Sequence, residues 1–169
     1  MVSPEKDLLT DRSRITRRAL LLRDSATESA VYHRLMNKSS ASWNQIEVAG
    51  EAFWIDRNGP AVLAFGKGPR WAEEHTRDRL EALRDGFGLK AALGLNQVHG
   101  ATVLDRTGGM GAKIEPEADG HVTRDQYVAL VVRTADCVPV LLSGGVWIAA
   151  IHAGWRGAAA GILPEAVLQ

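Results

Sequence analysis

The chain has 169 residues, enough for one domain of ordinary size with a working core. Lys and Arg together number 20, as do Asp and Glu, so the formal net charge is zero and no overall field favours nucleic acid or an anionic membrane. No apolar run reaches the roughly 18 residues that suggest a spanning helix. A single cysteine excludes an internal disulfide and fits a reducing compartment, so we expect a cytoplasmic protein.

Residues 1–42 are polar and charged, and they predict a helix-capable appendage that carries little of the core. A basic cluster surrounds the short apolar run 19–22, but the acidic residues near it argue against a transit peptide, and no apolar core follows that would suit a signal peptide. Met36 precedes a polar loop and is an alternative native start. We therefore predict an appendage over 1–42 and a folded domain over 43–169.

The domain predicted over 43–169 alternates short β-prone runs with helical ones, which indicates a mixed α/β or α+β fold. Residues 71–89 have apolar residues at helical spacing, acids early and glycines at the end, so they predict a helix. A second helix is expected from Gly157, with an interruption at Pro164. Strands are expected over 44–55 with a break at Gly50, and over 61–65, 93–105 with a break at Gly100, 127–134, 138–143 and 146–153.

Three side chains at predicted strand ends are candidate metal ligands. His99 precedes Gly100, where the backbone can turn close beside the imidazole. Cys137 joins two apolar runs, and His152 ends the last predicted strand, followed by small residues. One cysteine and two histidines form the N,N,S set of a catalytic zinc site that keeps one position open. Their intervals of 38 and 15 residues mean that only the fold can bring them together.

Each candidate ligand also has an ordinary structural interpretation. An isolated histidine is often a core or edge residue bonded to a backbone carbonyl, and a free cysteine is often a small buried hydrophobe. Antiparallel pairing of 138–143 with 146–153 around their glycine turn would return His152 to Cys137. This pairing would bring the two side chains together, and on the residues alone both interpretations stay open.

Asp136 and Arg156 are the candidate catalytic residues beside these ligands. Asp136 places a carboxylate among apolar residues, where it could orient a metal-bound histidine, move a proton, or pair with Arg133 or Arg156. Arg156 lies near the start of the last predicted helix, and a guanidinium beside free amides suits a phosphate or carboxylate. A surface ion pair is the alternative for Arg156, and a core position is the alternative for Trp155.

Other residues carry weaker signals for chemistry. The segment 66–68, Gly-Lys-Gly, lacks the full phosphate-loop pattern and predicts a turn. In the segment ADGHVT, His121 could line a site, whereas Asp119 is expected to serve only its local turn.

Four motifs now make a family resemblance visible: QVHG at 97–100, ADGHVT at 118–123, TADCVPVLL at 134–142 and HAGWRGAAAGI at 152–162. Together they resemble the YfiH-type family of purine nucleoside phosphorylases, long labelled laccase-domain or multicopper polyphenol oxidase proteins. The similarity covers roughly residues 60–169. It implies an α/β fold of mixed sheets flanked by helices, related to bacterial toxin deamidase domains.

The resemblance also implies a zinc site made by His99, Cys137 and His152. It implies phosphorolysis of adenosine, and of inosine, guanosine and methylthioadenosine, together with deamination of adenosine. The partners are then purine nucleosides and phosphate, with no nucleic acid and no membrane. We expect Arg156 and Gln97 to contact the substrate, and Asp136 and Arg156 to act in catalysis.

Several alternatives to this enzyme stay open. The older family label implies copper-dependent polyphenol oxidation, although one mononuclear site cannot supply the several coppers of a laccase. A cysteine hydrolase or deamidase, with Cys137 as nucleophile and His152 or His99 as base, is another alternative.

Relatives continue past the HAGWRG helix, so we expect the domain over 43–169 to lack the C-terminal part of the family fold. An inactive purine-binding homologue, or a homo-oligomer formed through an exposed sheet edge, would fit that expectation.

Overall fold

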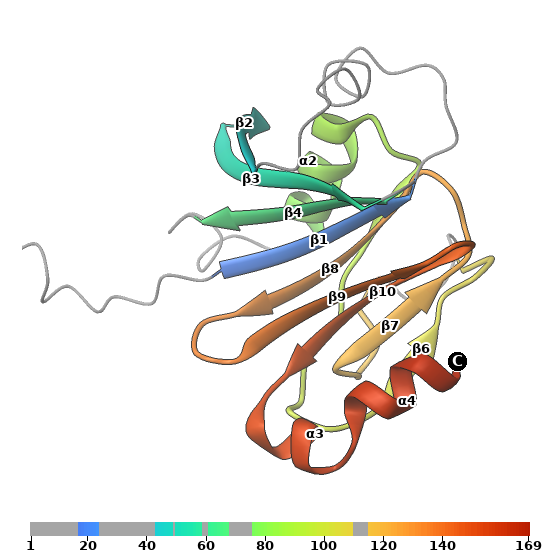
Figure 1. Cartoon of the computed structure of the whole chain (residues 1–169). Coiled ribbons are helices and arrows are strands. Elements are labelled where there is room, and N and C mark those ends of the chain that lie inside the picture. The colour runs from blue at the N-terminus through green and yellow to red at the C-terminus, as the bar shows by residue number, and fades with distance from the viewer. Residues whose placement is uncertain (1–16, 24–42, 49, 59–60, 68–75, 110–114) are drawn as a thin grey trace, which may run out of the picture.

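The computed structural model describes residues 17–23, 43–48, 50–58, 61–67, 76–109 and 115–169 (Figure 1). Within these residues the chain forms two mixed sheets and three helices, which confirms the expected mixed α/β (α+β) class. None of the described helices is long and apolar enough to cross a membrane. The alternative start at Met36 lies outside the described residues.

The first sheet has six strands in the order β2-β3-β4-β1-β8-β5. Neighbouring strands are antiparallel except β5 and β8, which run parallel. The strand predictions at 44–55, 61–65 and 127–134 are confirmed. The bounds are Arg17–Arg23 for β1, Asn44–Val48 for β2, Glu51–Asn58 for β3, Ala61–Lys67 for β4, Ala91–Leu93 for β5 and Val128–Thr134 for β8.

Strand β1 corrects the prediction for the amino-terminal segment. Arg17–Arg23 was expected to be helix-capable and to carry little of the core, but it pairs antiparallel with both β4 and β8 and so lies inside the first sheet. The run 19–22 has the length of a strand, and the charges on either side of it masked that signal. The division of the chain near residue 42 stays a prediction.

Strand β4 corrects a second prediction. Gly66 was expected in a turn but lies within β4. A Cβ at this position would come within 2.6 Å of the Phe53 ring. Glycine therefore leaves the space beside the strand that the Phe53 ring occupies.

The second sheet has four strands in the order β6-β7-β10-β9, with β6 and β7 parallel and the other pairs antiparallel. The predicted hairpin of β9 and β10 is confirmed, and its register sets His152 opposite Pro139 and Ala153 opposite Val138. The end of β10 and the β8–β9 connection therefore lie on the same side of the molecule (Figure 1). The bounds are Val103–Asp105 for β6, Gly120–Thr123 for β7, Val138–Gly144 for β9 and Trp147–Ala153 for β10.

The predicted strand over 93–105 is only partly correct. It divides into β5, which ends at Leu93, and β6, which begins at Val103. Between them the chain has one isolated bridge, from Asn96 to Glu117. The irregular stretch carries His99, so a loop rather than a strand end positions this histidine.

Three apolar clusters hold the helices and sheets together. Helix α2, Thr76–Phe87, confirms the helix predicted over 71–89, whose first five residues lie outside the described part. It covers one face of the first sheet and buries Leu80, Leu83 and Phe87 against Phe53. A second cluster lies between the sheets and takes Leu130 and Val132 from β8 with Ile148 and Ala150 from β10. The third joins the outer face of the second sheet to helix α4 through Val122, Ile151, Ile162 and Ala166.

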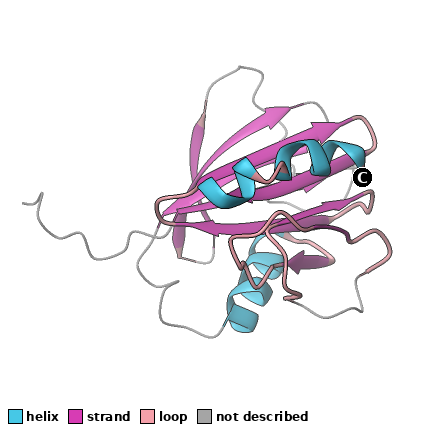
Figure 2. Ribbon diagram, turned by 90° about the horizontal axis from the view of Figure 1, so that it is seen from below, coloured by secondary structure: helices cyan, strands magenta, loops and turns pink. Residues whose placement is uncertain are grey.

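The last two helices, α3 (Trp155–Ala159) and α4 (Ile162–Leu168), lie across the second sheet (Figure 2). The predicted interruption exists, but it falls at Gly161, whose φ of 85° ends the run of helical dihedrals. Pro164 lies in the first turn of α4, where a missing amide proton breaks no intrahelical bond. Pro164 therefore does not interrupt the helix.

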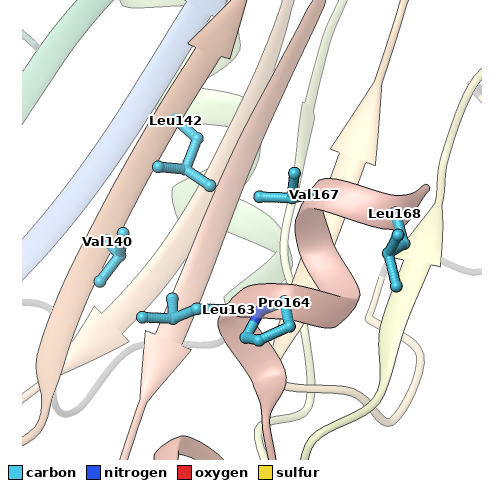
Figure 3. Close-up of a pocket in the computed structure, with 6 residues that line it drawn as sticks. All are labelled: Val140, Leu142, Leu163, Pro164, Val167 and Leu168. Carbon is cyan, nitrogen blue, oxygen red and sulfur yellow. The ribbon is translucent and has the colours of Figure 1, made fainter.

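An apolar groove of about 470 Å³ runs between strand β9 and helix α4 (Figure 3). Val140 and Leu142 contribute from the strand, and Leu163, Pro164, Val167 and Leu168 from the helix. The groove lies on the outer side of the second sheet, whereas His152 and Asp119 lie on the inner side with the core between the sheets.

Candidate metal site

The three predicted ligands converge in the structure. His99, Cys137 and His152 each offer one ligand atom, and these atoms lie within 4.8 Å of one another. The rings of the two histidines stand nearly perpendicular, with centroids 4.8 Å apart. Zinc bonds of about 2.0 to 2.3 Å need donors grouped on this scale. The donor chemistry and the spacing of these residues therefore fit one metal ion.

Strand β10 positions His152, which is 3% exposed. Its Nδ1 lies 2.8 Å from Oδ1 of Asp119, and its backbone amide donates to the Asp119 carbonyl over 2.7 Å. With the proton on Nδ1, the ring donates to the carboxylate and its Nε2 lone pair stays available. This is the arrangement by which a carboxylate fixes the tautomer and direction of a metal-bound histidine.

Asp119 also shapes the loop that carries His99. Its carboxylate accepts hydrogen bonds from three successive amides, at 3.3 Å from Val98, 2.9 Å from His99 and 2.6 Å from Gly100. Successive amides that point at one anion form a backbone nest. His99 adopts a φ of 62°, a left-handed conformation that costs free energy for a residue with a side chain. The expected turn at Gly100 is thus made by His99 itself.

The role of Asp119 was missed in the sequence, where Asp136 was favoured as the orienting carboxylate. Asp119 is fully buried, whereas Asp136 is exposed, so the expected burial of Asp136 is wrong. The available signal was an acid directly before Gly120, the first residue of the buried strand β7. A buried carboxylate needs partners, and Asp119 finds them across both histidine segments. A catalytic role for Asp136 stays a prediction.

Two glycines allow helix α3 to approach the ligands. A Cβ on Gly154 would lie 3.3 Å from Sγ of Cys137 and 3.3 Å from Cδ2 of His99. A Cβ on Gly157 would overlap the carbonyl oxygen of Gly100. The glycines of the HAGWRG motif therefore act by letting the helix pack closely against the two ligand loops.

Gln97 joins the ligand loop to strand β8. Its Nε2 donates to the Arg133 carbonyl over 2.7 Å, and its Oε1 accepts the Arg133 amide proton over 2.8 Å. Both ends of the amide are therefore engaged with backbone. Each end of the amide can make one more hydrogen bond, and the contact with substrate expected for Gln97 stays a prediction.

Arg156 and Trp155 are both exposed at the start of α3. The guanidinium lies 5.2 Å from the centre of the Trp155 ring, and the Trp155 side chain is 77% exposed. The alternative core position for Trp155 is wrong. Arg156 lies two residues after Gly154, and its expected role in substrate binding and catalysis stays a prediction.

The three candidate ligands, His99, Cys137 and His152, form a triad. His121 is a buried histidine outside this triad. It is fully buried on β7, and neither ring nitrogen has a hydrogen-bond partner among the described residues. Burial, with the nearby Arg106 charge, lowers the pKa of His121 to about 3. The ring is therefore neutral at neutral pH.

Residues 64–169 match the family model described as multi-copper polyphenol oxidoreductase laccase. The match covers more than half of the chain and includes all three candidate ligands. The chain belongs to this laccase-domain, or YfiH-type, family. The family resemblance drawn from the four motifs is thereby confirmed.

Curated members of the YfiH-type family match parts of the chain. A purine nucleoside phosphorylase of Rickettsia conorii is 42% identical over 85 residues, which are 49% of this chain and 35% of that one. One of Streptomyces coelicolor is 48% identical over 75 residues, 43% and 31% of the two chains. The Shigella flexneri purine nucleoside phosphorylase YfiH is 45% identical over 75 residues, 43% and 30%. The chain thus spans about a third of the length of these relatives.

A solved structure of a Neisseria meningitidis protein, described by the DUF152 family model, is also similar. The two chains are 35% identical, with a TM-score of 0.49, over 60% of this chain and 40% of that one.

Proposed function

We propose that the chain carries the metal-dependent site of a purine nucleoside phosphorylase. The observation that supports it is the convergence of His99, Cys137 and His152 in a chain whose curated relatives have that name. The proposed substrates are adenosine, inosine, guanosine and methylthioadenosine with phosphate, and deamination of adenosine is the proposed second reaction.

Zinc is the metal we propose for this site. His99, Cys137 and His152 would hold it, and Asp119 would orient His152. A bound zinc ion with an open position supplies a Lewis acid and lowers the pKa of a water molecule there.

In phosphorolysis a phosphate oxygen bonds to C1′ of the sugar as the bond from C1′ to the purine nitrogen breaks. The electron pair of the broken bond stays on the purine, which takes up a proton. Arg156 would hold the phosphate, because an exposed guanidinium can donate hydrogen bonds to two of its oxygens at once. Asp136, exposed beside Cys137, would hold or pass the proton.

The role of Arg156 is tested by substitution. Arg156→Ala should raise the KM for phosphate about tenfold or more, and Arg156→Lys should recover part of the loss, because lysine keeps the charge without the paired donors. Equal KM values for phosphate in the wild type and Arg156→Ala would remove Arg156 from the phosphate site.

Copper-dependent phenol oxidation is the second candidate, because the family model has that description. Thiolate and imidazole also bind copper. Among the described residues, however, the triad is the one group of at least three His, Cys, Asp or Glu side chains placed to hold a metal. Oxygen uptake by the copper-loaded protein with a phenol would support oxidation, and phosphorolysis without it would support the phosphorylase.

The alternative in which Cys137 is a nucleophile makes a different prediction. Under zinc ligation the thiolate should resist alkylation until a chelator is added. A nucleophilic thiol should react at the same rate with and without the chelator.

The experiment that tests the proposal is incubation of the zinc-loaded protein with adenosine, with and without phosphate. We expect adenine and ribose 1-phosphate only when phosphate is present, and inosine in both samples. Cys137→Ser should form none of these products. Adenine formed equally without phosphate would indicate a hydrolase, and the absence of all three products from the wild type would contradict the proposal.

A further inference from the structure

A pocket of about 460 Å³ opens beside Cys137. Its walls come from Trp54 on β3, from Phe65 and Gly66 on β4, and from residues 135–139, which join β8 to β9. This volume lies within the roughly 300 to 1,000 Å³ of small-molecule sites. Because Cys137 belongs both to the pocket and to the ligand triad, a molecule in the pocket lies next to the metal site.

One wall of the pocket is aromatic. Trp54 and Phe65 are direct cross-strand partners, so both rings project from the same face of the first sheet. Trp43 packs against Phe65 with ring centroids 5.3 Å apart, which restrains the Phe65 ring. Trp54 is 40% exposed, so part of its indole is accessible to a ligand.

The wall formed by residues 135–139 carries one charged side chain. Asp136 lines the pocket, and a carboxylate accepts hydrogen bonds from N–H groups. The other residues of that wall are Ala135, Cys137, Val138 and Pro139. A pocket lined by two aromatic rings and one carboxylate suits a flat heterocycle with an N–H group at its edge. Purine bases have this chemistry, and they stack on aromatic side chains.

We propose that this pocket is the base subsite, in which the purine stacks on Trp54 and Phe65 with its amino edge toward Asp136. The identity of the base rests on the proposed phosphorylase function. The pocket makes Trp54 and Asp136 specificity-determining residues, next to the metal site but outside its ligand set.

Trp155 provides a matched control for Trp54. It is also an exposed tryptophan close to the triad, but it does not line the pocket, and its ring lies against the Arg156 guanidinium. Removal of each indole therefore separates stacking in the pocket from a general effect of an aromatic surface.

The test is adenosine binding, without phosphate, by the full chain from which zinc has been removed with a chelator, measured by calorimetry, because the zinc-loaded chain is expected to deaminate adenosine. Trp54→Ala should weaken adenosine binding about tenfold or more, Trp54→Phe should retain most of it, and Trp155→Ala should bind as the wild type does. Asp136→Asn should weaken binding of adenosine more than that of purine riboside, which lacks the amino group. Zinc content before chelation should stay unchanged in all four variants. If Trp54→Ala does not fold, Trp54→Leu replaces it, because leucine fills space without a π face.

The outcomes separate the subsite from the reaction. Wild-type adenosine affinity in the Trp54 variants, with phosphorolysis intact, would overturn the subsite and leave the proposed function standing. Loss of binding in Trp54→Ala but not in Trp155→Ala supports the subsite even if the wild type forms no product. A wild type that neither binds adenosine nor forms product would overturn both.

Discussion

The carboxylate of Asp119 connects the two histidines of the triad. Its Oδ1 accepts the His99 amide proton over 2.9 Å and lies 2.8 Å from the His152 ring nitrogen. One buried side chain therefore sets both the conformation of the His99 loop and the direction of the His152 ring. A metal site with these ligands depends on Asp119 although Asp119 is not a ligand.

Replacement of Asp119 should weaken metal binding. Asp119→Asn keeps the size of the side chain but replaces one acceptor oxygen with a donor, so the nest of amides and the His152 ring cannot all stay satisfied. We expect zinc affinity to fall about 10- to 100-fold, measured by competition with a chelator. Asp136→Asn is the matched control and should retain wild-type affinity. Equal losses in both variants would contradict the positioning role of Asp119.

His121 makes stability depend on pH. Its pKa is about 3 in the folded chain against 6.5 when unperturbed, so between these values the unfolded chain binds a proton that the folded chain excludes. The contribution of His121 to the free energy of unfolding is therefore fully present above about pH 6.5 and is lost progressively as the pH falls toward 3. The loss between pH 7 and pH 5 is on the order of 2 kcal/mol.

His121→Leu should remove this part of the acid destabilisation, because leucine has no proton to bind and the ring nitrogens have no partner to lose among the described residues. Urea unfolding of the metal-free variant at pH 7 and pH 5 measures the effect. The same loss of stability in the variant and in the wild type would contradict the assignment to His121.

At the scale of single residues, the convergence of His99, Cys137 and His152 could be predicted, because two histidines and a cysteine form a recognised zinc set and the motifs resemble a family. Asp119 could not be recognised, since its partners at 98–100 and His152 come from distant parts of the sequence. The burial of Asp136 was predicted wrongly because a neighbourhood in the sequence does not fix which side chains face solvent.

Among the elements, helix α3 depends on its close approach to the His99 loop. Gly157→Ala would place a methyl group on the Gly100 carbonyl oxygen. Overpacking of this kind costs about 1 to 3 kcal/mol, and it should also weaken zinc binding because the ligand loop must move. Ala159→Gly, at an exposed position of the same helix, should cost no more than about 1 kcal/mol. Wild-type stability and zinc affinity in Gly157→Ala would show that the helix and the loop do not pack this way.

The elements that could be predicted are those with a strong local pattern. Helix α2 has apolar residues at helical spacing, and the β9–β10 hairpin has two apolar runs around a glycine turn. Strand β1 was missed because its pairing with β4 and β8 is long-range and the arginines around it favoured an exposed segment. The break between α3 and α4 was placed at Pro164 because the left-handed φ of Gly161 leaves no distinct mark in an alanine- and glycine-rich sequence.

On the scale of the whole molecule, the site exists because two sheets pack with their inner faces together. The core between them takes Leu130 from one sheet and Ile148 from the other. Asp119 and His152 lie on that inner side of the second sheet, and Cys137 lies in the connection that passes from one sheet to the other. The strand order that brings these residues together could not be predicted from local patterns, because it depends on pairings between distant segments.

The most direct test of the metal site is the zinc content of the purified chain by elemental analysis after zinc loading and dialysis. We predict about one zinc ion per chain in the wild type, and far less in His99→Ala, Cys137→Ser and His152→Ala. His121→Leu, which removes a histidine outside the triad, should retain the wild-type content. Wild-type zinc content in any of the three ligand variants, or a wild type that retains no metal, would contradict a site built from His99, Cys137 and His152.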